Sequence, residues 1–239
     1  MSPKGTIAIE EAVLNPDGIE LHAETATLYA PGATLEQIRE HPLTKNLLDI
    51  HSERLARMDA SGVEYMLLSL TSAGVQGEPD PAKAVTTAIS VNDWLSGQVK
   101  LNPKRFGALA AIPMHDGESA AKELRRAVKE LGFFGAILND YQEVHGADGR
   151  DRIYYDGPEF HPFWAAAEEL DAPVYLHPRY PAPADLAPGA KYGPGRRQLL
   201  GAGVQFHLDL SFHVYAICSS GVFDKYPKVQ VVLGHLGEG

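Results

Sequence analysis

The chain has 239 residues, of which 44% are hydrophobic and 22% are charged, and its formal net charge is −10. These values predict a packed fold rather than a disordered chain. The acidic balance and the lack of basic runs argue against nucleic acid or an anionic membrane as a partner. The sequence shows no apolar stretch of membrane-spanning length and no signal peptide, so we expect a cytoplasmic protein. Cys218 has no second cysteine to pair with, and its apolar neighbours predict a buried thiol.

Six apolar runs, taken in chain order, predict β-strands that are buried on both faces. They are residues 6–9, 63–70, 106–112, 135–138, 173–176 and 229–233. Helical patterns lie between them, at residues 47–61, 81–101, 117–131, 162–170 and about 201–220. Strands that alternate with helices indicate a parallel sheet with helical crossovers, so the predicted class is α/β. The length suits one barrel-type domain that covers residues 1–239.

Two long segments interrupt this alternation, at residues 11–45 and 178–199. We expect both to be irregular. Each directly follows a predicted strand, which is typical of the loops that cover a substrate in a barrel.

Parallel α/β folds bind their ligands at the carboxyl ends of the strands, so the residues that follow each apolar run are candidates for a site. They are Glu10, Thr71, Ser72, His115, Asn139, Asp140, His177 and His235. Carboxylates and imidazoles at one rim predict a metal site or an acid/base site.

Glu10 and His177 are the strongest of these candidates. Glu10 lies beside Glu11, and two acids at the mouth of a buried strand are costly to desolvate unless they are paired or bound to a cation. The alternative is a solvated strand end. His177 precedes Pro178, which ends the strand and fixes the exit of the chain. Arg179 suits an anionic substrate and a neighbouring acid equally well.

His235 and Glu238 are separated by two residues, so the carboxylate could fix the tautomer of the imidazole. Alone, this spacing is weak evidence. We expect most other histidines to lie on the surface or to be hydrogen-bonded in the core. For His115, such a structural role and a catalytic role are about equally favoured.

Taken together, four stretches resemble a known family. They are IAIEEA at residues 7–12, FHPFWAAAEELDAPVYLHP at 160–178, LHPR at 176–179 and GVFDKYPKVQVVLGHLGE at 221–238. This combination resembles the decarboxylase branch of the amidohydrolase superfamily, close to the 2,3-dihydroxybenzoate, salicylate and γ-resorcylate decarboxylases. The resemblance implies a TIM-barrel-like (β/α)₈ fold that carries one divalent metal ion and decarboxylates a small hydroxylated aromatic acid without oxidation.

By this resemblance, Glu10 and His177 are metal ligands, and His235 and Glu238 are the catalytic pair beside the aromatic acid. The ion would be Mg²⁺, Mn²⁺ or Zn²⁺. Many members carry a histidine where this chain has Ala12, and alanine there favours the dihydroxybenzoate and salicylate subgroup. Members are typically homodimers or homotetramers, so we expect a homo-oligomer.

Family members continue well beyond the LGHLGE motif, and their eighth strand supplies an aspartate that is both metal ligand and proton donor. This chain has no residues to match that part. Six predicted strands are also two short of a closed barrel. The expectation is therefore a C-terminally truncated barrel that is inactive, or nearly so, by itself.

Two other functions remain open. One is an amidohydrolase-type hydrolysis of an ester, a lactone or an amide, against which the missing nitrogen ligand at Ala12 argues mildly. The other is a truncated, non-catalytic remnant that needs a partner, because an open sheet edge favours association.

Overall fold

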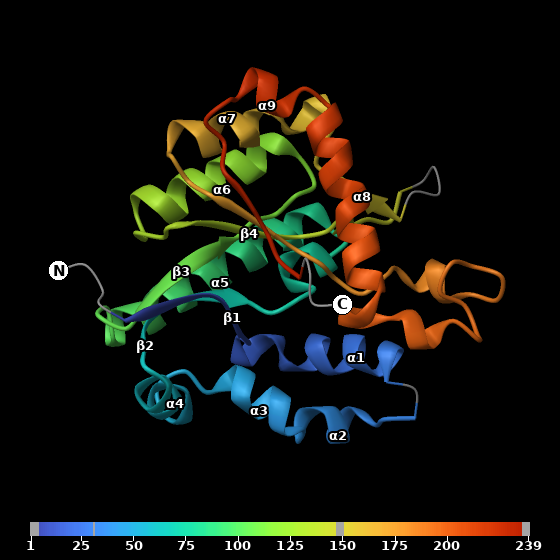
Figure 1. Ribbon diagram of the computed structural model, residues 1–239, viewed down its shortest axis with the longest axis horizontal. Helices are drawn as coiled ribbons and strands as arrows, with labels where there is room; N and C mark the ends of the chain where they lie inside the picture. Colours follow the sequence, from blue (N-terminus) through green and yellow to red (C-terminus); the bar gives the residue numbers. More distant parts are fainter. Residues whose placement is uncertain (1–4, 31, 147–150, 236–239) are drawn as a thin grey trace. The chain divides into compact units, whose positions relative to one another are not determined.

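The computed structural model describes residues 5–30, 32–146 and 151–235 (Figure 1). The chain divides into two compact units. The first contains residues 1–71 and 93–109, and the second contains residues 72–92 and 110–239. The prediction of one domain over residues 1–239 stays a prediction.

The first unit is built on strands β1 (Thr6–Val13), β2 (Val63–Leu70) and the first part of β3 (Phe106–Ala111). β1 pairs with β2 and β2 pairs with β3, all in parallel. β1 is longer than predicted, so Glu10 lies within the strand and not after it. The pairing register shifts between Ala8 and Glu11, which places Glu10 in an irregular part of this ladder.

Strand β1 is not buried on both faces, and this prediction was wrong. The side chains of Ile7 and Ile9 are 47% and 45% exposed. Among the described residues, β2 is the one strand that pairs with β1. The prediction also fails for β8 (Val231–Leu233), whose three residues are all partly exposed. An apolar run therefore identified these strands but not their burial.

The segment between β1 and β2 is largely helical, which contradicts the prediction of an irregular segment at residues 11–45. It contains α1 (Ile19–Tyr29), α2 (Leu35–Arg39) and α3 (Pro42–Leu48), the helices drawn in blue in Figure 1. The next helix, α4 (Glu53–Ser61), lies within the helix predicted at residues 47–61. Local capping defines the short ones. Thr34 forms a capping box with Gln37, and His41 accepts a hydrogen bond from the backbone of Leu43. Hydrophobic periodicity does not detect such caps.

The second unit contains the parallel strands β4 (Gly135–Asn139), β7 (Val174–His177) and β8. Helices α6 (Gly117–Lys129) and α7 (His161–Glu169) pack side by side (Figure 1). The turn that precedes α7 approaches α6 closely, because a Cβ atom at Gly117 would lie 2.3 Å from the backbone oxygen of Glu159. Trp164 of α7 is fully buried, and its indole nitrogen donates to the backbone oxygen of Tyr155. The predicted helices at residues 117–131 and 162–170 are thus confirmed within two residues at each end.

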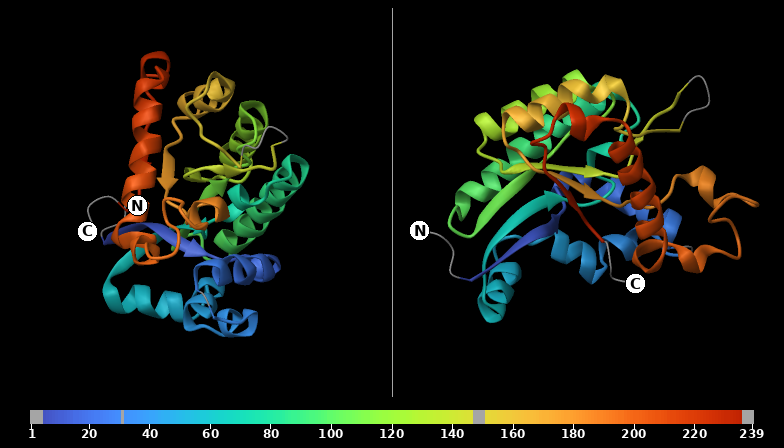
Figure 2. Two further views of the ribbon diagram at one scale, coloured as in Figure 1. Left: turned by 90° about the vertical axis from the view of Figure 1, so that its right-hand side faces the viewer. Right: turned by 45° about the horizontal axis from the view of Figure 1, so that its top comes forward.

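Three further elements of the second unit were not predicted. They are a hairpin of two short strands, β5 (Gln142–Glu143) and β6 (Arg152–Ile153), and the one-turn helix α9 (Val222–Lys225). The segment at residues 178–199 contains only the short 3-10 helices η4 (Pro183–Leu186) and η5 (Arg197–Leu199), so its irregular character is confirmed. Figure 2 shows this segment in orange, and it leads to the first turn of α8 (Gln205–Ser219).

Helix α8 exposes part of its apolar surface. The side chains of Leu208, Phe212 and Tyr215 are all more than half exposed, and Cys218 is exposed as well. The prediction of a buried thiol was wrong because the apolar residues around Cys218 do not all face the core. Among the described residues, no helix has both the length and the apolar character needed to cross a bilayer.

The remaining long helix is α5 (Pro81–Leu101), which confirms the predicted bounds. Each unit therefore combines parallel strands with helices, and the predicted α/β class is confirmed.

Candidate functional site

Two of the predicted site residues stand at the carboxyl ends of neighbouring strands. His177 is the last residue of β7, and His235 follows β8 after Gly234. The backbone nitrogen of Gly234 donates to the oxygen of Leu176 over 3.0 Å, which keeps the two strand ends together. His235 has a φ angle of 54°, in the left-handed region, so the chain turns sharply at this residue.

The imidazoles of His177 and His235 contact each other. Their Nε2 atoms are 3.3 Å apart, and their ring planes are nearly perpendicular, at 86°. Both side chains are partly buried. Two unprotonated ring nitrogens would repel each other at this distance, so one Nε2 carries a hydrogen or a cation lies against the pair. The pair can therefore exchange a proton or contribute to a metal site.

An aromatic row extends from this pair. The ring centroid of Phe206, in the first turn of α8, lies 5.5 Å from that of His235, and the ring of Tyr180 lies 5.3 Å from Phe206. Such edge-to-face contacts stabilise the rings against one another. The row gives the histidine pair an apolar side, which is suited to an aromatic ligand. The sequence carried no spacing signal for Phe206 or Tyr180.

Glu10 belongs to the first unit, and Glu238 lies outside the described residues. Glu10 is partly buried in β1 of the first unit. Its neighbour Glu11 binds Arg54, with 3.0 Å between Glu11 Oε2 and a guanidinium nitrogen. Burial raises the pKa of Glu11, Arg54 opposes that rise, and the charge of Glu10 adds to it. Glu238 lies outside the described residues, so its predicted role stays a prediction.

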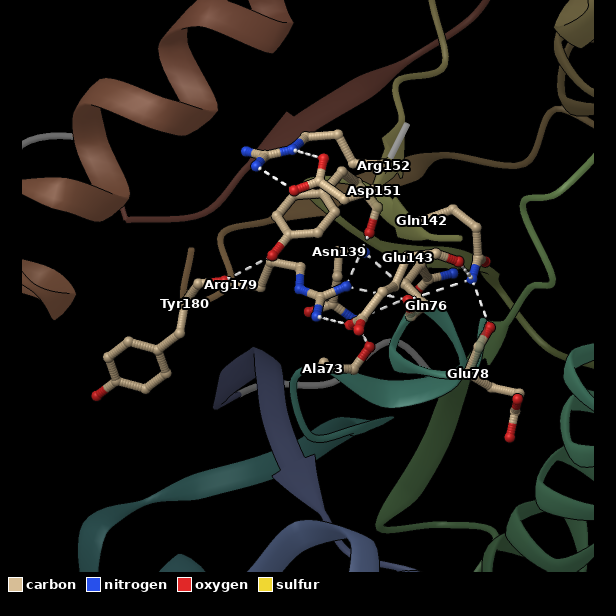
Figure 3. A network of polar contacts seen from close by, with 11 residues as sticks. Ala73, Gln76, Glu78, Asn139, Gln142, Glu143, Asp151, Arg152, Arg179 and Tyr180 are labelled. Carbon is tan, nitrogen blue, oxygen red and sulfur yellow. Dashed lines mark hydrogen bonds and ion pairs between the residues drawn. The ribbon is translucent and has the colours of Figure 1, made fainter. Parts of the chain in front are cut away.

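Arg179 is held inside the protein by a buried network (Figure 3). It is 5% exposed, and it donates to the backbone oxygens of Gln76 and Tyr141 over 3.0 and 3.1 Å. Its other terminal nitrogen donates to Glu143 Oε2 over 3.0 Å, and its guanidinium lies 4.0 Å from the ring centre of Tyr141. Of the two roles open to Arg179, the structure favours pairing with an acid.

Two buried amides complete this network beside His177. Asn139, the last residue of β4, pairs in register with His177 of β7. The Nδ2 atom of Asn139 donates to Gln76 Oε1 and to the backbone oxygen of Ala73, in both cases over 3.0 Å. Gln76 donates in turn to the backbone oxygen of Ile112. Asn139 was predicted at the rim from its place in the chain, but Gln76 was missed.

The other predicted rim residues have partners away from the histidine pair. His115 Nε2 lies 3.1 Å from the backbone oxygen of Pro79. Asp140 lies 3.2 Å from the imidazole of His213, and both are buried. The backbone nitrogen of Thr71 donates to the oxygen of Val13. These contacts do not include either histidine of the pair, and the roles of the three side chains stay predictions.

Comparison with known proteins shows which family the chain resembles. A protein-family profile described as "Amidohydrolase" matches residues 39–239. The γ-resorcylate decarboxylase of Rhizobium sp. (strain MTP-10005) is 38% identical over 236 residues, which cover 99% of this chain and 68% of that protein. The chain thus spans about two thirds of the length of this relative.

Solved structures give the same result. A crystal structure of 2,6-dihydroxybenzoate decarboxylase complexed with 2,6-dihydroxybenzoate has a TM-score of 0.85 and 39% identity, and the match covers 98% of this chain and 68% of that one. The dihydroxybenzoic acid decarboxylase of Polaromonas sp. JS666, with bound manganese and the inhibitor 2-nitroresorcinol, also has a TM-score of 0.85 and 39% identity, covering 98% of this chain and 66% of that one.

Proposed function

Because the chain belongs to the amidohydrolase family, in the branch of the aromatic acid decarboxylases, we propose that it removes the carboxyl group of a hydroxylated aromatic acid without oxidation and with the help of a divalent metal ion. The structural similarity supports the predicted TIM-barrel-like fold, of which this chain spans about two thirds. The observation that carries the proposal is the contact between His177 and His235 at neighbouring strand ends.

The donor atoms suit a divalent ion. We propose that His177 and Glu10 hold it, because an imidazole nitrogen and a carboxylate oxygen together suit Mn²⁺ or Zn²⁺, and oxygen ligands also suit Mg²⁺. The close approach of His235 Nε2 to His177 Nε2 fits a position where positive charge is favourable. When bound, the ion would orient the substrate carboxylate and the adjacent hydroxyl and stabilise the phenolate.

His235 would act on the hydroxyl of the substrate. Its Nε2 accepts the hydroxyl proton, and Glu238 would orient the ring and stabilise the imidazolium. The phenolate would then feed electrons into the ring, and the carboxylated carbon would take up a proton from an acid, the role that the family resemblance gives to the aspartate of the eighth strand. The bond to the carboxylate breaks, its electron pair returns to the ring, and carbon dioxide leaves. This sequence needs no oxidant and no electron-accepting cofactor.

Phe206 would bound the substrate ring on one side. It packs edge-to-face against His235, so a flat aromatic acid beside His235 would also meet an aromatic wall. Such a wall suits the flat face or edge of an aromatic substrate.

The purified 239-residue protein tests the proposal directly. Binding of 2,6-dihydroxybenzoate, 2,3-dihydroxybenzoate and salicylate is measured by calorimetry with and without Mn²⁺, and carbon dioxide release is followed in parallel. We expect Mn²⁺-dependent binding, and release that exceeds that of a His235→Asn variant. A chain that binds none of the three acids, or that instead hydrolyses an ester or lactone, would contradict the proposal.

The same assay addresses the expectation that this chain alone turns over slowly or not at all. Metal-dependent binding with little release agrees with that expectation, and rapid release with stoichiometric metal contradicts it. The homo-oligomeric state and the cytoplasmic location also stay predictions.

A further inference from the structure

Asn139 shares a face of the sheet with His177. The two residues are register partners at the ends of adjacent parallel strands, and such partners direct their side chains to the same side. Asn139 is only 3% exposed. A polar side chain therefore stands one strand away from the proposed metal ligand, at the same level.

The orientation of this amide is fixed by its partners. Gln76 Nε2 donates to the carbonyl of Ile112, so the oxygen of Gln76 must face the other way, where the backbone nitrogen of Asn139 donates to it. Asn139 Nδ2 then lies between two acceptors, Gln76 Oε1 and the carbonyl of Ala73 (Figure 3). A flipped amide would place oxygen against oxygen at both contacts.

The remaining atom of this amide is an acceptor that lacks a donor. Asn139 Oδ1 is buried, and within the described part of the chain nothing donates to it. Buried polar atoms are nearly always hydrogen-bonded, and an acceptor left unpaired is unfavourable. The atom should therefore meet a donor from a ligand. A carboxylate has no hydrogen to donate, whereas a phenolic hydroxyl does.

We propose that Asn139 Oδ1 accepts a hydrogen bond from a second hydroxyl of the aromatic acid, so that Asn139 selects dihydroxylated over monohydroxylated substrates. This inference rests on the proposed function, and it adds the residue that reads the ring-substitution pattern. In the reaction, one ortho hydroxyl would lie with the carboxylate at the metal and His235. The other hydroxyl would lie toward β4. There the orientation of the Gln76 and Asn139 amides leaves Asn139 Oδ1 as an acceptor to which this hydroxyl can donate.

The test uses two ligands that differ at one ring position, where one has a hydrogen-bond donor and the other has none. 2,6-Dihydroxybenzoate has both hydroxyls, whereas 2-fluoro-6-hydroxybenzoate keeps the carboxylate and one hydroxyl and replaces the other with a small group that cannot donate. Binding of both is measured by calorimetry in saturating Mn²⁺. We expect the wild-type protein to bind the dihydroxy acid roughly tenfold more tightly. In Asn139→Ala the two affinities should agree within about twofold.

Tyr155→Phe is the matched control. The hydroxyl of Tyr155 donates to the backbone oxygen of Asn139 over 2.7 Å, so its loss disturbs the same strand end without touching Oδ1. This variant should keep the preference for the dihydroxy acid. If Tyr155→Phe loses that preference, the effect comes from packing at the strand end, and the inference is overturned.

The remaining outcomes separate the inference from the proposed function. An unchanged preference in Asn139→Ala, as expected if Oδ1 binds only a buried water, would overturn the inference alone. If Asn139→Ala does not fold, the wild-type protein decides, because equal affinities for the two acids contradict the inference. Failure of the wild-type protein to bind either acid would overturn both.

Discussion

His213 donates a hydrogen bond from Nδ1 to Asp140 Oδ1 over 3.2 Å, in a part of the second unit where both side chains are almost completely buried. The other ring nitrogen of His213 accepts from the backbone nitrogen of Tyr155 over 3.0 Å. His213 therefore carries its hydrogen on Nδ1 and is neutral. This contact connects α8 to the end of β4, and so links the helix that carries Phe206 to the strand that carries Asn139.

Loss of this imidazole should destabilise the protein strongly. His213→Phe leaves the Asp140 carboxylate and the Tyr155 backbone nitrogen buried without partners, so we expect the free energy of unfolding to fall by about 3–5 kcal/mol. His207→Phe, on the same helix, is the control and should cost less than about 1 kcal/mol. Urea unfolding monitored by circular dichroism measures both. Equal effects of the two variants would show that the buried pair contributes nothing specific.

Arg179 should contribute to stability rather than to anion binding. Arg179→Met removes the donors to Glu143 and to two backbone oxygens, and should lower the free energy of unfolding by about 3 kcal/mol. Arg179→Lys should recover part of this loss, since lysine keeps the charge but lacks the planar fork. Urea unfolding and hydroxybenzoate binding are measured together. Weaker binding of the aromatic acid at unchanged stability would instead support an anion-binding role.

Substitutions of His177 and of His235 should have different effects on metal affinity and on carbon dioxide release. If His177 is a ligand, His177→Ala lowers the affinity for Mn²⁺ at least about tenfold. If His235 is the base, His235→Gln changes Mn²⁺ affinity little but slows carbon dioxide release by about 10²–10⁴-fold. Electron paramagnetic resonance of free Mn²⁺ gives the affinities. His115→Gln is the control, because its imidazole contacts the backbone of Pro79. Equal losses of Mn²⁺ affinity in the two site variants would contradict separate roles.

The strand ends could be predicted from the sequence because a short run of apolar residues is enough to recognise each strand. Apolar runs predict buried parallel strands, and the residues that follow them lie at one edge, which led to Asn139, His177 and His235. No local sequence pattern identifies the residues that contact these strand ends. Gln76 reaches Asn139 across 63 residues, and Phe206 meets His235 only through the packing of α8. Contacts between distant segments depend on tertiary packing, which a single sequence does not encode as a spacing.

The wrong predictions have physical causes of the same kind. The helices α1 to α3 bury few side chains, so the apolar pattern that reveals α6 is weak there, and α2 and α3 begin at residues whose side chains cap them. Cys218 was expected inside because its neighbours are apolar, yet α8 leaves Phe212 and Tyr215 exposed too. Composition reports how apolar a segment is, and it does not report which face is covered.

Acid should weaken the protein through Asp151. Its two carboxylate oxygens accept from two guanidinium nitrogens of Arg152, both over 2.8 Å, and this hydrogen bonding lowers the pKa of Asp151 below its ordinary value of 3.8. A carboxylate with a lowered pKa in the folded state stabilises the fold above the unfolded-state pKa. That contribution is lost as the pH falls through the folded-state pKa.

Asp151→Asn should therefore flatten the dependence of stability on pH below 3.8 and lower stability near neutral pH. Melting temperatures measured between pH 7 and pH 2 for the wild-type and variant proteins give the two curves. Glu130→Gln, at the end of α6, is the control and should keep the wild-type slope. The two curves should converge toward low pH, where the wild-type carboxylate is protonated, and a constant separation at every pH would contradict a stabilising role of Asp151.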